Sequence, residues 1–302
     1  MQKRFYSNGK LLITSEYLVL DGATALALPT KFGQDLVVEE TQNQTIAWTS
    51  YEVDGGIWME VHLSIESIIS GHGNNLNPQE ERLFSILHQA HLMNPNLLQN
   101  TSGFSVETHL GFPKLWGLGS SSTLINNVAQ WFDIDAYQLL ERTFGGSGYD
   151  IACAQHNSAI LYRKHQNNPE IQEIDFEPAC AEHIYFVYLN QKQDSRKAIE
   201  TYRTKNQTSK NITVFNTLTQ DVLAQNDFDS LSQIMHKHEE LLSEILEIKP
   251  VQETLFNDFN GTIKSLGGWG GDFVMALCKS NPKDYFAAKG FTTILPYSEM
   301  IQ

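Results

Sequence analysis

The stretch Pro113-Lys-Leu-Trp-Gly117-Leu-Gly119-Ser120-Ser121-Ser122-Thr123 decides the fold of this 302-residue chain. Gly117 and Gly119 permit a tight backbone turn with no Cβ in the way of a bulky anion. Three serines follow at once, and Leu124–Phe132 then reads as a helix. A helix N-terminus carries unpaired N–H groups and a partial positive charge, which favour phosphate. The segment indicates a phosphate-binding loop, with a serine-capped helix after a glycine turn as the alternative interpretation.

The loop differs from two other nucleotide-binding sequences. It does not end in Gly-Lys-Ser/Thr, so it is not a Walker A loop, and it lacks the third glycine of a dinucleotide fingerprint. Its serine hydroxyls can donate to phosphate oxygens or bind Mg²⁺.

Three further segments are interpreted together with the loop. They are Gly9-Lys10-Leu-Leu-Ile-Thr-Ser-Glu16-Tyr17-Leu-Val-Leu-Asp-Gly22, Gly146-Ser-Gly148-Tyr-Asp150-Ile-Ala152 and Lys264-Ser-Leu-Gly267-Gly268-Trp269-Gly270-Gly271-Asp272. Taken in their order along the chain, with the phosphate loop second, the four segments resemble the signatures of the GHMP kinases. This is the superfamily of galactokinase, homoserine, mevalonate and phosphomevalonate kinases. The pair Glu16-Tyr17 and the trailing Asp272 are most similar to the phosphomevalonate kinase branch. The resemblance extends over nearly the whole chain.

The resemblance implies an α+β, two-domain GHMP kinase fold. Residues 1–180 would form a nucleotide-binding half like domain 2 of ribosomal protein S5, and residues 181–302 a ferredoxin-like half. The active site is expected between the two halves.

The chain departs from the superfamily pattern at several positions. Ser7-Asn8 stands where Ala-Pro is usual, and Ser122-Thr123 stands where paired alanines are common. Trp269 replaces a small residue. We expect these changes to affect the choice of substrate more than the fold.

Phosphoryl transfer to an alcohol requires an in-line acceptor, neutralised phosphate charge and a destination for the proton. The resemblance identifies Asp150 as the catalytic carboxylate, which would accept that proton. It also implies that Lys10 lies beside Asp150, where an ammonium group would lower the carboxyl pKa and stabilise charge on the phosphoryl group. From the residues alone, the alternative interpretations are a turn or cap residue for Asp150 and a surface lysine for Lys10.

The implied cofactors are ATP and Mg²⁺. ATP would be held by Gly117, Leu118, Gly119, Ser120, Ser121 and Ser122. Mg²⁺ would be held by Ser121 and Glu141, although a solvated helix glutamate explains Glu141 as well.

The acceptor substrate would contact residues from the first and third signatures and from a segment near residue 195: Glu16, Tyr17, Ser195, Arg196, Gly268 and Gly270. Lys192, Arg196 and Lys197 surround Asp194-Ser195, an expected helix N-cap, and could bind an acidic substrate. A solvated helix face is the alternative. Asp272 is either a ligand or a cap.

The resemblance implies an ATP-dependent kinase acting on a small hydroxy acid, with mevalonate or phosphomevalonate as the leading substrate. Diphosphomevalonate decarboxylases share the architecture but usually have alanine in place of Gly119. A sugar kinase is a second alternative, although the chain lacks a galactokinase-like Arg-Glu-His-Thr-Asp stretch. A non-catalytic nucleotide-binding regulator is a third.

Composition restricts the remaining classes. The formal net charge of −14 disfavours nucleic acid and anionic membranes as partners. No apolar run approaches the ~20 residues that cross a bilayer, and no signal peptide precedes the first strand, so we expect a cytoplasmic protein. A homodimer is compatible with the sequence. Three separated cysteines indicate free thiols, and His236 and His238, two positions apart on an expected helix, face apart and predict no metal site.

Hydrophobic periodicity predicts the remaining elements. Strands are expected over residues 11–13, 17–20, 23–29, 46–53, 57–63, 103–110, 159–162, 171–176, 183–189, 273–278 and 292–295. Helices are expected over residues 80–93, 123–132, 136–144, 195–202, 214–225, 228–245 and 251–266.

Overall fold

A computed structural model describes residues 2–99, 101–165, 168–193, 195–204 and 209–302. The chain forms two compact units that alternate along the sequence. Unit 1 contains Met1–Gly9, Phe32–Lys114 and Gly119–Gln155, and unit 2 contains Lys10–Lys31, Leu115–Leu118 and His156–Gln302. The chain passes from unit 2 into unit 1 within the phosphate loop, between Leu118 and Gly119. The domain boundary expected at residue 180 stays a prediction.

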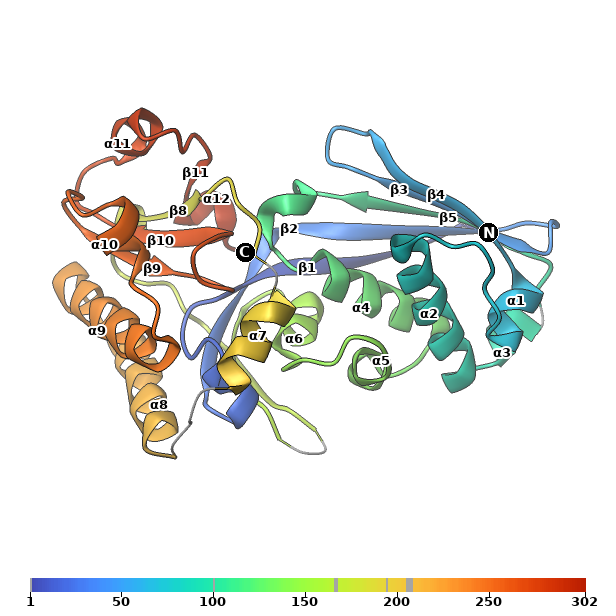
Figure 1. The fold of residues 1–302 in the computed structure, drawn as a ribbon, viewed down its shortest axis with the longest axis horizontal. Helices are drawn as coiled ribbons and strands as arrows, with labels where there is room; N and C mark the ends of the chain where they lie inside the picture. Colours follow the sequence, from blue (N-terminus) through green and yellow to red (C-terminus); the bar gives the residue numbers. More distant parts are fainter. Residues whose placement is uncertain (1, 100, 166–167, 194, 205–208) are drawn as a thin grey trace. The chain divides into compact units, whose positions relative to one another are not determined.

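The sheet of unit 1 is built from alternating sequences. In β5 (Phe104–Leu110) every second residue is buried, so one face of the strand packs on a core while the other is half-exposed. The strand order is β4 (Ile57–Ser64), β3 (Thr45–Tyr51), β5 and β2 (Ala25–Glu40), and β1 (Lys3–Leu12) pairs with β2. β3 runs parallel to β5, whereas β4 pairs antiparallel with β3 and β2 pairs antiparallel with β5 (Figure 1).

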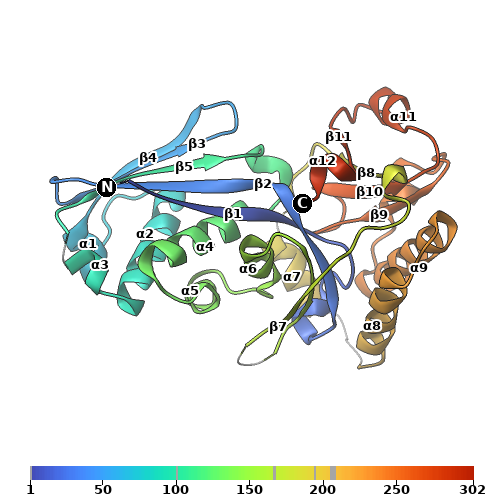
Figure 2. The ribbon, with the colours of Figure 1, turned by 180° about the vertical axis from the view of Figure 1, so that it is seen from behind.

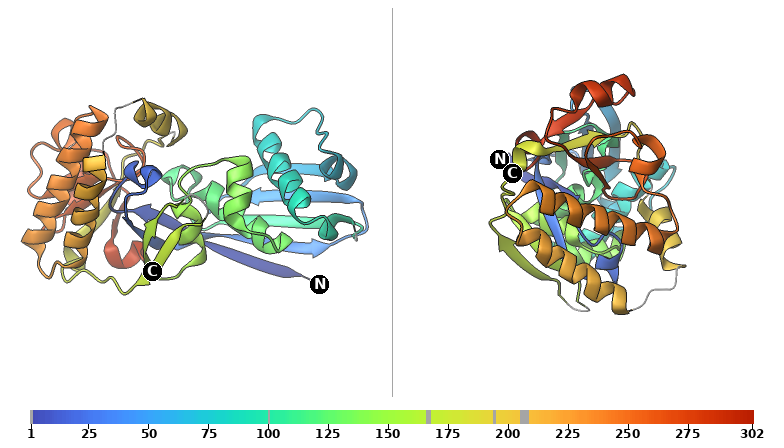
Figure 3. Two further views of the ribbon diagram at one scale, coloured as in Figure 1. Left: turned by 90° about the horizontal axis from the view of Figure 1, so that it is seen from below. Right: turned by 90° about the vertical axis from the view of Figure 1, so that its left-hand side faces the viewer.

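Helices cover one face of this sheet, as Figures 1 and 3 show. They are α1 (Ile65–Ser70), α2 (Pro78–Met93), α3 (Asn96–Gln99), α4 (Ser120–Phe132), α5 (Ala136–Thr143) and α6 (Tyr149–Gln155). Asn77 starts α2 with a capping box to Glu80, which explains why the helix begins before residue 80. Fully buried apolar side chains such as Trp48 and Leu87 fill the space between the helices and the sheet.

Unit 2 contains an antiparallel sheet in the order β11 (Ile294–Pro296), β8 (Ile184–Tyr188), β10 (Phe273–Leu277) and β9 (Thr262–Ser265). All five residues of the central β10 are buried, as expected for a strand with both faces covered. In the same unit, β6 (Ala159–Arg163) pairs with the first residues of β2, and β7 (Glu170–Ile174) pairs with β6 (Figure 2).

The helices of unit 2 include a long antiparallel pair. α8 (Ser209–Leu223) and α9 (Phe228–Leu246) lie side by side, and α9 packs on β9 (Figure 3). Asp227 caps α9 by accepting a hydrogen bond from the Ser230 N–H. The others are α7 (Ser195–Arg203), α10 (Val251–Leu255), α11 (Lys283–Ala288) and α12 (Tyr297–Met300).

Two of the predicted elements are wrong. Residues 17–20 do not form a strand, because Ser15 and Tyr17 have φ values of 63° and 64° and turn the chain into a 3₁₀ helix, Leu18–Asp21. The helix expected over residues 251–266 ends at Leu255, and Thr262–Ser265 becomes β9. Pairing with β10 overrides the local helical pattern there, and the close approach needs Gly261, whose Cβ would stand 2.3 Å from the Leu277 carbonyl oxygen.

Most of the other predicted elements agree with the structure within a few residues. The strands predicted over residues 11–13 and 23–29 are much too short, because β1 begins at Lys3 and β2 continues to Glu40. The three cysteines are free and buried, as predicted. Within the described ranges, no helix has the length and apolar character needed to cross a bilayer. The same ranges contain no cluster of histidine, cysteine and carboxylate side chains suited to a metal ion.

Candidate active site

The phosphate loop leads into the first turn of α4. Gly119 has a φ of 94° and precedes Ser120, the first helical residue, so the predicted helix begins three residues earlier than residue 123. The N–H groups of Ser122 and Thr123 both donate to the Gly119 carbonyl, each at 2.9 Å. Ser121 is exposed, and this turn holds no acidic residue. The first turn of α4 therefore presents serine hydroxyls at a helix N-terminus and carries no carboxylate of its own.

Asp150 lies in the first turn of α6 and is half-buried. Gly148 has a φ of 89° in the turn that starts this helix. α6 packs against α4 within unit 1, and the Gln155 side chain donates to Oδ1 of Asn126 at 2.9 Å. The structure thus brings the helix that carries Asp150 against the helix that begins with Ser120.

The other half of the phosphate loop meets the first and third signatures within unit 2. The Lys10 N–H donates to the Leu118 carbonyl at 3.0 Å. Gly117 faces the carboxylate of Asp272, and a Cβ on Gly117 would stand 2.4 Å from Cγ of Asp272. Three segments that are far apart in sequence therefore converge at Gly117–Leu118.

Asp272 anchors the end of the glycine-rich third signature. It is buried, and its carboxylate accepts a hydrogen bond from the Gln193 N–H at 3.1 Å. Burial raises the pKa of Asp272, and the positive charges of Lys10 and Lys192 partly oppose this rise. The hydrogen bond from Gln193 supports the cap interpretation of Asp272, and its role as a ligand stays a prediction.

The glycines of the third signature allow close packing on Gln193. A Cβ on Gly268 would stand 2.8 Å from Cβ of Gln193, and one on Gly270 3.3 Å from its amide nitrogen. Trp269, between them, is buried in an apolar cluster with Tyr17 and Tyr202. Its indole Nε1 is buried without a hydrogen-bond partner.

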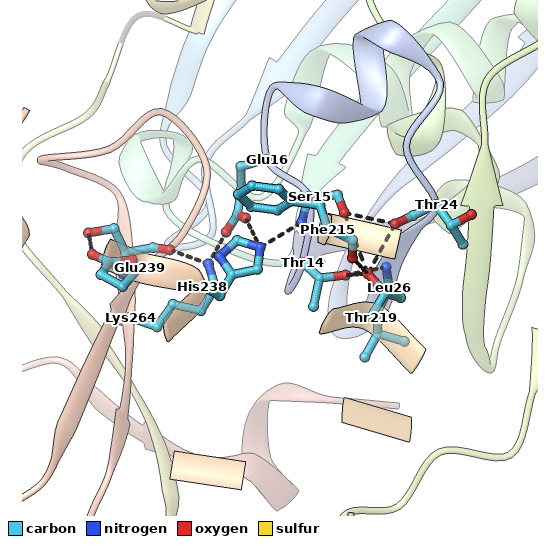
Figure 4. A network of polar contacts seen from close by, with 11 residues as sticks. Thr14, Ser15, Glu16, Thr24, Leu26, Phe215, Thr219, His238, Glu239 and Lys264 are labelled. Atoms are coloured by element: carbon cyan, nitrogen blue, oxygen red, sulfur yellow. Dashed lines mark hydrogen bonds and ion pairs between the residues drawn. The ribbon is translucent and has the colours of Figure 1, made fainter. Parts of the chain in front are cut away.

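Glu16 is held inside unit 2 by a buried lysine (Figure 4). Nζ of Lys264 donates to the Glu16 carboxylate and to the Ser265 carbonyl, and Lys264 is 0% exposed. Glu239 accepts hydrogen bonds from Ser265, whose hydroxyl donates at 2.6 Å. Burial raises the pKa of Glu16 to about 7, although Lys264 opposes that rise.

His238 completes this network. Its Nε2 accepts a hydrogen bond from the Ser15 N–H at 2.9 Å and lies 3.5 Å from the Glu16 carboxylate. Burial lowers the pKa of His238 well below its usual value, so the imidazole is neutral. His236 instead is exposed and lies 3.3 Å from Glu240, so the two histidines face apart as the helical spacing predicted.

Tyr17 packs against a second aromatic side chain in the same unit. Its ring stacks on Tyr202 with centroids 5.3 Å apart, and the Tyr202 hydroxyl donates to Asp21 at 2.5 Å. Burial raises the pKa of both phenols.

The remaining predicted site residues are placed as follows. Lys10 is half-buried in unit 2, and Glu141 is exposed on α5. Lys192 and Lys197 are exposed. Asp194 and the side chains of Ser195 and Arg196 lie outside the described residues. The roles assigned to all of these residues stay predictions.

Sequence reasoning assigned no role to Lys264, Glu239 or His238 in the network around Glu16. Lys264 was visible as the first residue of the third signature, but the helix predicted over residues 251–266 concealed its place in β9, whose other residues are mostly buried. A lysine almost never becomes fully buried without a partner, so a carboxylate partner could have been sought.

Comparison with solved structures identifies the fold. No protein-family profile and no curated protein sequence matches the chain. Mevalonate kinase from Methanococcus jannaschii superposes with a TM-score of 0.72 at 16% identity, covering 98% of this chain and 97% of that one. Phosphomevalonate kinase from Streptococcus pneumoniae, in complex with phosphomevalonate and AMPPNP, gives 0.71 at 16% identity, covering 96% and 97%.

A sugar kinase shares the same architecture. Galactokinase from Lactococcus lactis, complexed with galactose, gives a TM-score of 0.68 at 12% identity and covers 95% of this chain and 88% of that one. This chain has the GHMP kinase fold. The fold predicted from four short signatures is therefore confirmed over nearly the whole chain, and the mevalonate and phosphomevalonate kinases are among the structures that it resembles.

Proposed function

We propose that this protein is an ATP-dependent small-molecule kinase that phosphorylates a small hydroxy acid, with mevalonate or phosphomevalonate as the leading substrate. The observation that carries the proposal lies within unit 1. α4, which begins with a glycine-preceded run of serines, packs against α6, which holds Asp150 in its first turn. Phosphate binding and proton acceptance by adjacent helices are the two functions that a kinase of this kind requires.

The chain's residues suit the binding of a nucleotide phosphate. The positive φ values of Gly117 and Gly119 keep the loop tight, and the exposed Ser121 hydroxyl can donate to a phosphate oxygen. Ser121 and Glu141 would hold Mg²⁺, which takes most of its ligands in such sites from phosphates and water. When bound, the metal neutralises charge on the transferring phosphoryl group.

In the proposed reaction, the acceptor oxygen forms a bond to the γ-phosphorus as the bond from that phosphorus to the bridging oxygen of ADP breaks. Where the acceptor is an alcohol, Asp150 accepts its proton. The helix N-terminus at Ser120–Ser122 orients the phosphates and stabilises their negative charge. Lys10 is proposed to add a positive charge to the same site.

A coupled assay of ADP release tests the proposal. The purified chain would be supplied with ATP, Mg²⁺ and, in turn, mevalonate, phosphomevalonate, homoserine and galactose. We expect ADP release with one of the first two acceptors and a new phosphate ester or anhydride in the product. Turnover with galactose alone would assign a sugar kinase instead. ATP binding without ADP release from any acceptor would overturn the kinase proposal and favour the non-catalytic regulator.

A further inference from the structure

A continuous run of hydrogen bonds crosses the interior of unit 1. The Gln155 amide donates to Oδ1 of Asn126, and Nδ2 of Asn126 donates to Oγ of Ser7, both at 2.9 Å. Oγ of Ser7 donates to Oδ1 of Asn127 at 2.7 Å, and Nδ2 of Asn127 donates to the Gln34 carbonyl at 2.9 Å. We call these five residues the relay.

Four of the five relay residues are buried, and the relay runs in one direction. Ser7, Asn126, Asn127 and Gln34 are each at most 2% exposed. Each side chain in the middle of the relay donates to the next residue while it accepts from the previous one. In a low-dielectric interior such bonds strengthen one another, and a buried polar group left without a partner is costly. Only one arrangement of the relay therefore satisfies all its members.

The relay connects the two helices of the candidate active site. Asn126 and Asn127 lie on α4, two turns after the first serine of the phosphate loop, and Gln155 ends α6, which carries Asp150. Ser7 and Gln34 lie on β1 and β2. The relay thus ties α4 and α6 to each other and to the sheet.

Thr123 extends the relay to the phosphate loop itself. Its hydroxyl donates to Oε1 of Gln34 at 2.6 Å, one turn into α4. Thr123 and Ser7 are also two of the positions at which the chain departs from the GHMP signatures, which usually have alanine there. An alanine has no hydroxyl, so both departures supply groups to one hydrogen-bonded system that belongs to this chain's own sequence.

We propose that the relay residues and Thr123 are positioning residues, which hold the first turn of α4 and the Asp150 carboxylate at the separation that phosphoryl transfer requires. This inference rests on the proposed function. None of the relay residues is proposed to touch the substrate. Their effect is large because a displacement of about 1 Å between reacting groups can reduce the rate roughly 100-fold.

Gln155→Glu tests the connection between the helices, because Gln155 lies at the surface and its replacement does not open the core. The new carboxylate cannot donate to Oδ1 of Asn126. If the Asn126 amide flipped, its Nδ2 could donate to the new carboxylate. Its Oδ1 would then face Ser7 and take the single hydroxyl proton of Ser7 away from Asn127. We expect kcat to fall about tenfold while the Kd for ATP changes by less than about twofold. Gln138→Glu, with the same charge change at an exposed site on α5, is the matched control and should leave kcat unchanged.

Thr123 tests the connection to the phosphate loop with two substitutions. Thr123→Val keeps the shape and removes the hydroxyl, whereas Thr123→Ser keeps the hydroxyl. We expect the valine variant to bind ATP roughly 3- to 10-fold more weakly, the equivalent of one lost hydrogen bond, and the serine variant to restore most of that affinity. Equal affinity in the two variants would contradict the role of the hydroxyl.

Hydrogen exchange separates a failure of this inference from a failure of the proposed function, because it needs no substrate. We expect the amides of residues 151–155 to exchange faster in Gln155→Glu than in the wild type and in Gln138→Glu. Unchanged exchange would overturn the relay whether or not the protein proves to be a kinase. Faster exchange with kcat unchanged would show that α6 is tied by the relay but not for catalysis, which would also overturn the proposal.

Discussion

Lys264 and Glu16 form an ion pair inside unit 2, with both side chains at most 1% exposed. The pair joins the third signature to the first, because Lys264 lies on β9 and Glu16 follows β1. Glu16 stands between Ser15 and Tyr17, both of which have positive φ values. The ion pair therefore holds a strained segment of backbone in place, and its cost and benefit can be measured.

Lys264→Met should destabilise unit 2 strongly. It would leave the Glu16 carboxylate buried without its cation, a loss that typically amounts to about 3–5 kcal/mol of unfolding free energy. Urea denaturation would measure it. Lys279→Met is the matched control, since Lys279 pairs with Asp229 at 2.8 Å on the surface and should contribute less than about 1 kcal/mol. Similar losses in both variants would contradict the importance of burial.

The stability of the protein should depend on pH through the ionisation of Glu16. Because the pKa of Glu16 is raised to about 7 in the folded state, the folded protein retains a proton that the unfolded chain releases near pH 4.5. The stabilisation of the folded state by protonated Glu16 is therefore fully present below about pH 4.5 and is lost as the pH rises through about 7. The change amounts to roughly 3 kcal/mol.

Glu16→Gln isolates this effect from the other titratable groups that face Glu16, namely Lys264, His238 and Glu239. The lowered pKa of His238 acts in the opposite direction below pH 6.5, and it is present in both proteins. We expect the stability of the wild type relative to Glu16→Gln to decline between pH 5 and pH 8. A difference that stays flat or rises over this range, measured by urea denaturation, would argue against a raised pKa.

Gly117→Ala should damage the phosphate loop more than a comparable substitution elsewhere. The alanine must adopt a φ near 70°, and its Cβ would meet the Asp272 carboxylate. Left-handed strain contributes about 1 kcal/mol and the steric overlap a further 1–3 kcal/mol. Gly145→Ala is the control, because Gly145 has a φ of 64° with open space around it. This variant should lose only the stability that left-handed strain removes, about 1 kcal/mol.

The Asp272 contact can be tested in the same series. Gly117→Ala should cost less stability in an Asp272→Ala background than in the wild type, since the second substitution removes the group that the new methyl meets. Thermal unfolding of the two single variants and the double variant gives the coupling. Strict additivity would mean that the two residues do not interfere.

Asp150→Asn should reduce kcat by about 100-fold or more while the Kd for ATP changes little, because the amide cannot accept the proton of the acceptor. Single-turnover ADP release and ATP titration measure the two quantities. Asp133→Asn is the control, since Asp133 is exposed in unit 1 and asparagine tolerates its left-handed backbone. Full turnover in Asp150→Asn would remove Asp150 from the mechanism.

Local sequence chemistry was a good guide where a segment's neighbours in the chain determine its structure. The hairpin of β3 and β4 followed from Asp54-Gly55-Gly56 between two alternating runs, and α2 followed from Pro78 and helical spacing. It failed for residues 251–266, where pairing of β9 with β10 decided the outcome. The local hydrophobic pattern of a segment does not show which distant strand it will pair with.

The sequence by itself predicted the fold through four ordered segments that resemble the GHMP kinase signatures, because the glycine turns and helix starts in these segments are short-range features that each segment carries within itself. Only the tertiary structure decided which polar groups meet. The partner of Glu16 is 248 positions away, and that of Ser7 on α4 is 120 positions away. Such pairs form because a buried charge or amide must find a partner, and only the folded chain determines which partner lies within reach.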